Sequence, residues 1–92
     1  MLIVSYDIKN DKLRTKFSKF LKQYGYRLQY SVFQLKNSNR ISQMVQEEIK
    51  HRFEKQFSNA DSIIVFKLSN ASVDKVIKFG YAKNMDDDIV FM

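Results

Sequence analysis

An aspartate lies near the end of an apolar stretch at the start of the sequence. Residues 2–8 read LIVSYDI, a run of strand-forming residues in which Asp7 is the one charged side chain. A carboxylate in that place is expensive to bury unless it is hydrogen-bonded, paired or coordinated to a cation. Two interpretations follow. Asp7 either accepts hydrogen bonds from amides in the connection after the strand, or it is a ligand for a hard cation such as Mg²⁺ or Mn²⁺.

One carboxylate per chain makes a weak metal site, so the second interpretation requires a partner. If two copies of the chain meet about a two-fold axis at this strand end, Asp7 faces its own copy. Two acids that share one divalent ion would form a phosphodiesterase centre.

The charge of the chain favours a polyanionic partner. The 92 residues contain 16 Lys and Arg against 10 Asp and Glu, which gives a net charge of +6 at pH 7. Residues 1–40 hold nine of the basic side chains and two acids, so the excess is concentrated there. The candidates for binding phosphates are Lys12, Arg14, Lys16, Lys19 and Arg27. The alternative for these residues is an ordinary solvated helix surface.

Other residue types offer fewer chemical possibilities. Tyr24, Tyr26, Tyr30 and Phe33 could stack on bases, although aromatic residues in strands more often belong to the core. The chain has no cysteine and one histidine, which excludes disulfides, thiolate zinc sites and the usual nucleophilic triads. Ser31 is a candidate phosphate contact.

The elements that must position these residues can be predicted from periodicity. Residues 2–8 form a strand that should be central in its sheet. Asn10 caps a helix that runs through Tyr24 and ends at Gly25. Residues 26–36 are extended and bend near residues 30–31 into two strands. Residues 61–68 form a further strand. Before it, a second helix begins at residue 38 or 39 and ends near residue 57, and its core stripe comprises Ile41, Met44, Val45, Ile49, Phe53 and Phe57.

This order predicts an α+β fold: a ferredoxin-like βαββαβ sandwich with an antiparallel sheet and both helices on one face. The uncovered face has apolar residues, which favours a homodimer. We expect a single domain over residues 1–92, with a core of residues 1–68 and a C-terminal extension of residues 69–92. Residues 88–92 are expected to form an edge strand, and the extension is expected to contact the second copy or another protein. The absence of cysteine, of a secretory segment and of a membrane span favours the cytoplasm.

Four segments together resemble the family of CRISPR-associated protein two, the small partner of the integrase in spacer acquisition. They are the strand that ends in Tyr-Asp-Ile (residues 6–8), the basic helix that closes with Tyr-Gly (24–25), RLQYSVF (27–33) and DSIIVF (61–66). The R-x-Q-x-S-V-F pattern at its distance from the strand-end Asp7 is the specific part, and the match covers residues 1–68.

The resemblance implies a ferredoxin-like homodimer in which Asp7 binds Mg²⁺ or Mn²⁺ and is catalytic. It places Tyr6, Ser31 and Phe33 near the active centre. Members of the family are described as metal-dependent endonucleases of single-stranded RNA or double-stranded DNA. They are also described as non-catalytic scaffolds that bridge dimers of the CRISPR integrase, CRISPR-associated protein one. A third possibility is a ribonuclease toxin on the same fold. Gln34 departs from the family pattern, in which an acidic residue often follows Phe33.

Overall fold

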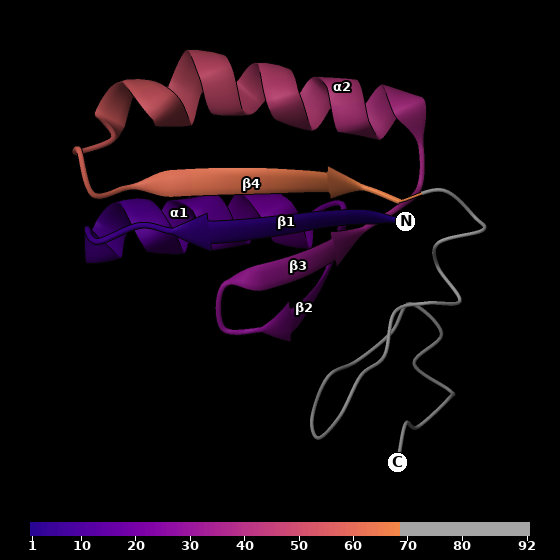
Figure 1. Ribbon diagram of the computed structural model, residues 1–92, viewed down its shortest axis with the longest axis horizontal. Coiled ribbons are helices and arrows are strands. Elements are labelled where there is room, and N and C mark those ends of the chain that lie inside the picture. Colours follow the sequence, from indigo (N-terminus) through magenta and orange to yellow (C-terminus); the bar gives the residue numbers. More distant parts are fainter. Residues whose placement is uncertain (69–92) are drawn as a thin grey trace.

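The computed structural model describes residues 1–68 and confirms the predicted order of strands and helices (Figure 1). The predictions for residues 69–92, including the C-terminal edge strand, lie outside the described residues. The elements are β1 (Leu2–Asp7), α1 (Asp11–Lys22), β2 (Gly25–Gln29), β3 (Val32–Leu35), α2 (Asn39–Glu48) and β4 (Ser62–Lys67). The last turns before β4 are a π-helical segment, Ile49–Phe53, and a 3₁₀ turn, Glu54–Gln56.

The strands form one antiparallel sheet in the order β2-β3-β1-β4, so β1 is central as predicted. Side chains alternate along β1: Leu2, Val4 and Tyr6 are buried, whereas Asp7 is exposed. The buried residues pack against both helices. The ring of Phe17 from α1 lies 5.1 Å from that of Tyr6 and 4.9 Å from that of Phe53. Both helices therefore cover the same face of the sheet.

The opposite face of the sheet keeps apolar side chains in solvent. Ile64 and Phe66 of β4 are 53% and 46% exposed. The strand register pairs Phe66 with Ile3 and Ile64 with Ser5 of β1. These residues, together with Asp7 at the end of β1, form what we call the open face.

Helix α1 starts as predicted but ends earlier. The Asn10 side chain accepts a hydrogen bond from the amide of Leu13 at 2.9 Å, which caps the first turn. The helix ends at Lys22 rather than Tyr24, and Gly25 is the first residue of β2. The prediction that Gly25 ends the helix is therefore wrong. A Cβ atom at Gly25 would overlap the carbonyl oxygen of Gln34 on β3. Glycine at this position therefore allows the backbones of β2 and β3 to approach each other closely.

Helix α2 begins after Ser38, whose hydroxyl accepts from the amide of Ile41 at 3.3 Å. Val45 and Phe53 are buried as predicted, and Ile41 is half-buried. Met44 is 36% exposed, so its place in the core stripe is not confirmed. The buried row follows i, i+4 spacing from Ile41, and Met44, at i+3, falls beside it. Within residues 1–68, no helix is long and apolar enough to cross a membrane.

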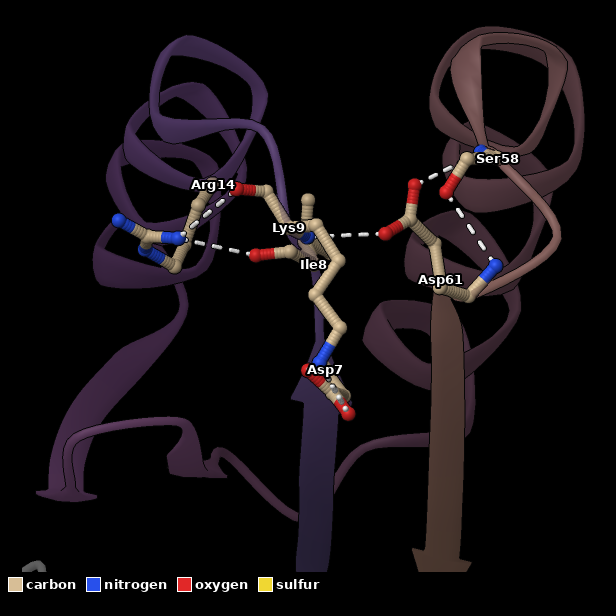
Figure 2. Close-up of polar contacts among 7 residues, drawn as sticks. Asp7, Ile8, Lys9, Arg14, Ser58 and Asp61 are labelled. Atoms are coloured by element: carbon tan, nitrogen blue, oxygen red, sulfur yellow. Dashed lines mark hydrogen bonds and ion pairs between the residues drawn. The ribbon is translucent and has the colours of Figure 1, made fainter.

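The carboxylate of Asp61 links the loop that follows β1 to the loop that precedes β4 (Figure 2). The two Asp61 oxygens accept hydrogen bonds from the amides of Lys9 and Ser58, each at 2.8 Å. These two backbone hydrogen bonds lower the pKa of Asp61, and the one from Lys9 has the larger effect. From the other side, Arg14 donates to the carbonyl of Ile8 at 3.0 Å. The backbone that follows Asp7 is thus held at two points. We call the Asp61 contacts the Asp61 clasp.

We expect Gly25→Ala to destabilise the fold by about 1–3 kcal/mol, because the new methyl group must push two strand backbones apart. Chemical denaturation measures this change. Gln29→Ala, at an exposed position of the same strand, is the matched control and should change little. Equal stability of Gly25→Ala and the wild type would contradict the close approach.

We expect Asp61→Asn to lower the denaturation midpoint at pH 7 and to matter less in acid. The pKa of Asp61 is lower in the folded than in the unfolded protein, so its contribution is complete above the ordinary carboxyl pKa of about 4. That contribution is lost as the pH falls below this value. Midpoints of wild type and variant should therefore converge between about pH 5 and pH 3. Glu54→Gln is the control, and a constant difference across this range would refute the clasp.

Candidate functional site

Asp7 is the last residue of β1, and its side chain is 61% exposed. Among residues 1–68 its polar partner is the ammonium of Lys9, with Nζ 3.1 Å from Oδ1 and 3.3 Å from Oδ2. Amide capping in this region is done by Asn10 and Asp61 instead. The interpretation in which Asp7 accepts hydrogen bonds from amides after the strand is therefore wrong. The carboxylate of Asp7 is accessible to a ligand.

An open cleft of about 880 Å³ lies beside Asp7. One wall is a row on α1 at i, i+4 and i+8, formed by Arg14, Ser18 and Lys22. Arg27 of β2 and the connection between β2 and β3 line the other side. The order of the strands brings these residues together, because β3 pairs with β1 and so places the β2–β3 turn beside the end of β1.

Contacts with Ser18 and Phe33 help to hold Arg27 in the cleft. Its Nη2 donates to the hydroxyl of Ser18 at 2.7 Å, and its guanidinium carbon lies 5.3 Å from the centre of the Phe33 ring. Ser18 and Phe33 are both buried. Phe33, expected near the active centre, is therefore a core residue beneath Arg27, where a ligand cannot contact it.

Tyr6 and Ser31, which are predicted to lie near the active centre, both line the cleft, and Tyr6 also has a structural role. Its hydroxyl donates to the carbonyl of Tyr30 at 3.2 Å, and its amide donates to that of Ser31 at 3.0 Å. Burial raises the pKa of Tyr6, and the nearby guanidinium groups of Arg27 and Arg14 oppose that shift. Tyr6 thus fixes the β2–β3 turn against the end of β1.

The structure divides the predicted phosphate-binding residues into two groups. Arg14 and Arg27 line the cleft with Asp7. Lys12, Lys16 and Lys19 are exposed on α1 and do not line it. We call these three residues the α1 lysine surface.

Lys9 and Lys22 also line the cleft, although neither was predicted to bind phosphate. Lys22 could have been found from its spacing of eight residues from Arg14 along one side of the helix. Lys9 follows the strand and had no periodic signal. Together with Arg14 and Arg27, these lysines make four basic residues among the described residues that line the cleft, where Asp7 is the one acid. Such a surface attracts an anion and presents a carboxylate to it.

The donor set limits what one copy of the chain can bind. Within residues 1–68, no group of three His, Cys, Asp or Glu side chains could hold a metal ion. Asp7 alone offers oxygen ligands that suit Mg²⁺ or Mn²⁺, both of which keep several waters. Among residues 1–68, Asp7 is the one acid that lines the cleft, so a site with two carboxylates there would need an acid from elsewhere.

Comparison with known proteins identifies relatives of the whole described region. Residues 1–76 match the family model of CRISPR associated protein Cas2. The CRISPR-associated endoribonuclease Cas2 2 of Methanospirillum hungatei is 30% identical over 79 residues, which cover 86% of this chain and 84% of that protein. The CRISPR-associated endoribonuclease Cas2 2 of Pyrobaculum aerophilum is 34% identical over 82 residues, covering 86% and 85%.

Solved structures have the same fold. The crystal structure of Streptococcus pyogenes Cas2 at pH 6.5 aligns with a TM-score of 0.68 at 21% identity, covering 86% of this chain and 98% of that chain. A hypothetical protein from Thermus thermophilus aligns with a TM-score of 0.64 at 26% identity, covering 75% and 80%. The family match extends well past half of the sequence and includes the strand, the cleft and Asp7. The chain therefore belongs to the CRISPR-associated protein Cas2 family.

Proposed function

We propose that the protein is a metal-dependent endonuclease of CRISPR adaptation that acts as a symmetric dimer with one Asp7 from each subunit. The observation that carries this proposal is an exposed carboxylate at the edge of a cleft lined by four basic residues. Single-stranded RNA is the first candidate substrate, because the curated relatives are named endoribonucleases. Double-stranded DNA is the second.

The dimer is supported by the open face of a ferredoxin-like sheet. Ile64 and Phe66 are about half exposed there, and Ile3 lies in register with Phe66. A second copy packed on this face would remove these side chains from water. Asp7 is four residues after Ile3 in β1. Because side chains in a strand point to alternate faces, Asp7 and Ile3 are on the same face of the sheet. A two-fold axis near the end of β1 would therefore bring two Asp7 carboxylates together.

Two such carboxylates would form a site for Mg²⁺ or Mn²⁺ completed by water. The ion, when bound, would lower the pKa of a bound water and stabilise the charge that develops on the scissile phosphate. The ion pair between Asp7 and Lys9 is solvent-exposed on both sides, and such pairs contribute little to stability. Asp7 can therefore exchange this partner for another cation at small cost.

The cleft residues would hold the nucleic acid next to Asp7. Arg27 is preoriented by its hydrogen bond to Ser18, and a guanidinium group has further N–H donors that can bind phosphate oxygens. Lys22 adds a charge from the adjacent helix. The Asp61 clasp fixes the backbone after Asp7 and limits the positions that its carboxylate can take.

The α1 lysine surface favours a second function. Lys12, Lys16 and Lys19 lie outside the cleft, so they can contact phosphates without presenting them to Asp7. A dimer that binds duplex DNA by this surface could bridge copies of the CRISPR integrase without chemistry of its own. The two functions use different residues and can be separated by mutation.

We expect Asp7→Asn to abolish cleavage, with a loss of at least about 100-fold, because the charged oxygen ligands are gone. Folding and nucleic-acid binding should be nearly intact, since the side chain is exposed. The assay compares labelled single-stranded RNA and duplex DNA with Mg²⁺, with Mn²⁺ and with a chelator. Glu54→Gln, an exposed acid far along the chain, is the control. Cleavage that persists in Asp7→Asn, or in chelator, would contradict the proposed site.

We expect the double variant Lys12→Gln, Lys16→Gln to weaken duplex DNA binding at low salt. The slope of log affinity against log salt should fall by about one unit for each phosphate that the variant no longer neutralises. Lys50→Gln with Lys55→Gln removes the same charge from the other helical segment and is the matched control. If both pairs weaken binding equally, only net charge matters and the α1 lysine surface is not a DNA-binding surface.

A further inference from the structure

Tyr30 is the most exposed large apolar side chain in the described part of the protein. It is 92% exposed, compared with 53% for Ile64 and 46% for Phe66. The other aromatic residues considered for base stacking are different. Phe33 is buried, and Tyr24 and Tyr26 are half-buried. Of the four, Tyr30 has the most exposed side chain.

The backbone that carries Tyr30 is fixed. Its carbonyl accepts the hydrogen bond from the buried Tyr6 hydroxyl at 3.2 Å, and the neighbouring Ser31 carbonyl accepts from the Tyr6 amide at 3.0 Å. The ring itself has no part in these bonds. A tyrosine side chain has two rotatable bonds, so ordering it against a ligand costs little conformational entropy. Tyr30 is therefore a rigidly mounted but uncovered aromatic surface.

The surroundings of Tyr30 indicate the ligand. Tyr30 lines the same cleft as Arg27, Lys22 and Arg14. A cationic cleft that follows a phosphate backbone, with an aromatic ring on which a base can lie, is the usual arrangement for binding single-stranded nucleic acid. In a duplex the faces of the bases are covered by their neighbours, so the ring would gain no stacking partner without unstacking a pair.

We propose that the Tyr30 ring stacks on an unpaired nucleobase of a strand whose phosphates lie against Arg27 and Lys22. Tyr30 thereby makes the cleft prefer single-stranded nucleic acid to duplex. This inference rests on the proposed function only in that the cleft binds nucleic acid. It does not depend on metal binding or on cleavage by Asp7.

The first test uses Tyr30→Trp in the full-length chain. The sequence has no tryptophan, so the variant has a single tryptophan fluorophore at the site. A 12-nucleotide uridine RNA is titrated in chelator, so that no metal-dependent cleavage occurs. The same titration uses an oligonucleotide of equal length and charge that lacks bases. We expect strong quenching by the RNA and little by the abasic strand, because only bases stack. Equal quenching by both would overturn the inference.

The second test measures affinity by anisotropy of labelled strands, again in chelator. Tyr30→Ala should weaken binding of the RNA by about 5- to 150-fold, whereas Tyr30→Phe, which keeps a ring, should bind like the wild type. Duplex affinity and the salt dependence of binding should be unchanged in both variants, because the phosphate contacts remain. Unchanged RNA affinity in Tyr30→Ala, or an equal loss for duplex, would refute the stacking role.

Sedimentation analysis of the same variants tests the competing explanation. If Tyr30→Ala alone changes the oligomeric state, Tyr30 is an interface residue and the inference fails. The outcome is also distinct from that of the proposed nuclease. A protein that never cleaves, but whose Tyr30→Trp variant is quenched by RNA and not by the abasic strand, would contradict the nuclease and support stacking.

Discussion

Along β1, successive side chains must point to opposite faces of the sheet, and the candidate site depends on that alternation. Tyr6 points into the core, where it contacts Phe17 and holds the β2–β3 turn. Asp7, the next residue, must therefore point to the open face. One strand thus anchors the cleft through one residue and supplies its carboxylate through the next. A shift of register by one residue would exchange the two roles.

The parts of the fold that could be predicted are those with a local signal. Asn10 and Ser38 are residues with short acceptor side chains immediately before periodic apolar runs, and both cap helices. Gly25 could not be interpreted correctly, because a glycine after a helix has the same local pattern whether it ends the helix or admits a neighbouring strand. The neighbour is Gln34, and its proximity is known only once β2 and β3 pair.

In the candidate site, too, the residues that could be predicted are those with a local signal in the sequence. Asp7 was identified because a charge at the end of an apolar strand is locally anomalous. The Asp61 clasp gave no such signal, since its carboxylate and the Lys9 amide are 52 residues apart in the sequence. The division of the basic residues also needed the structure. Arg14 and Lys16 are two residues apart on one helix, yet only Arg14 lines the cleft. Charge composition alone treats them as equivalent.

The pairing of β1 with β4 has a consequence for how the chain folds during synthesis. Leu2 lies opposite Lys67, and the amide of Leu68 donates to the carbonyl of Met1 at 2.8 Å. β1 therefore leaves the ribosome well before β4, and its second edge stays unpaired until β4 has been synthesised. Until then, an apolar strand edge is exposed on a nascent chain that already carries both helices. During that interval the nascent protein is most open to pairing with another chain.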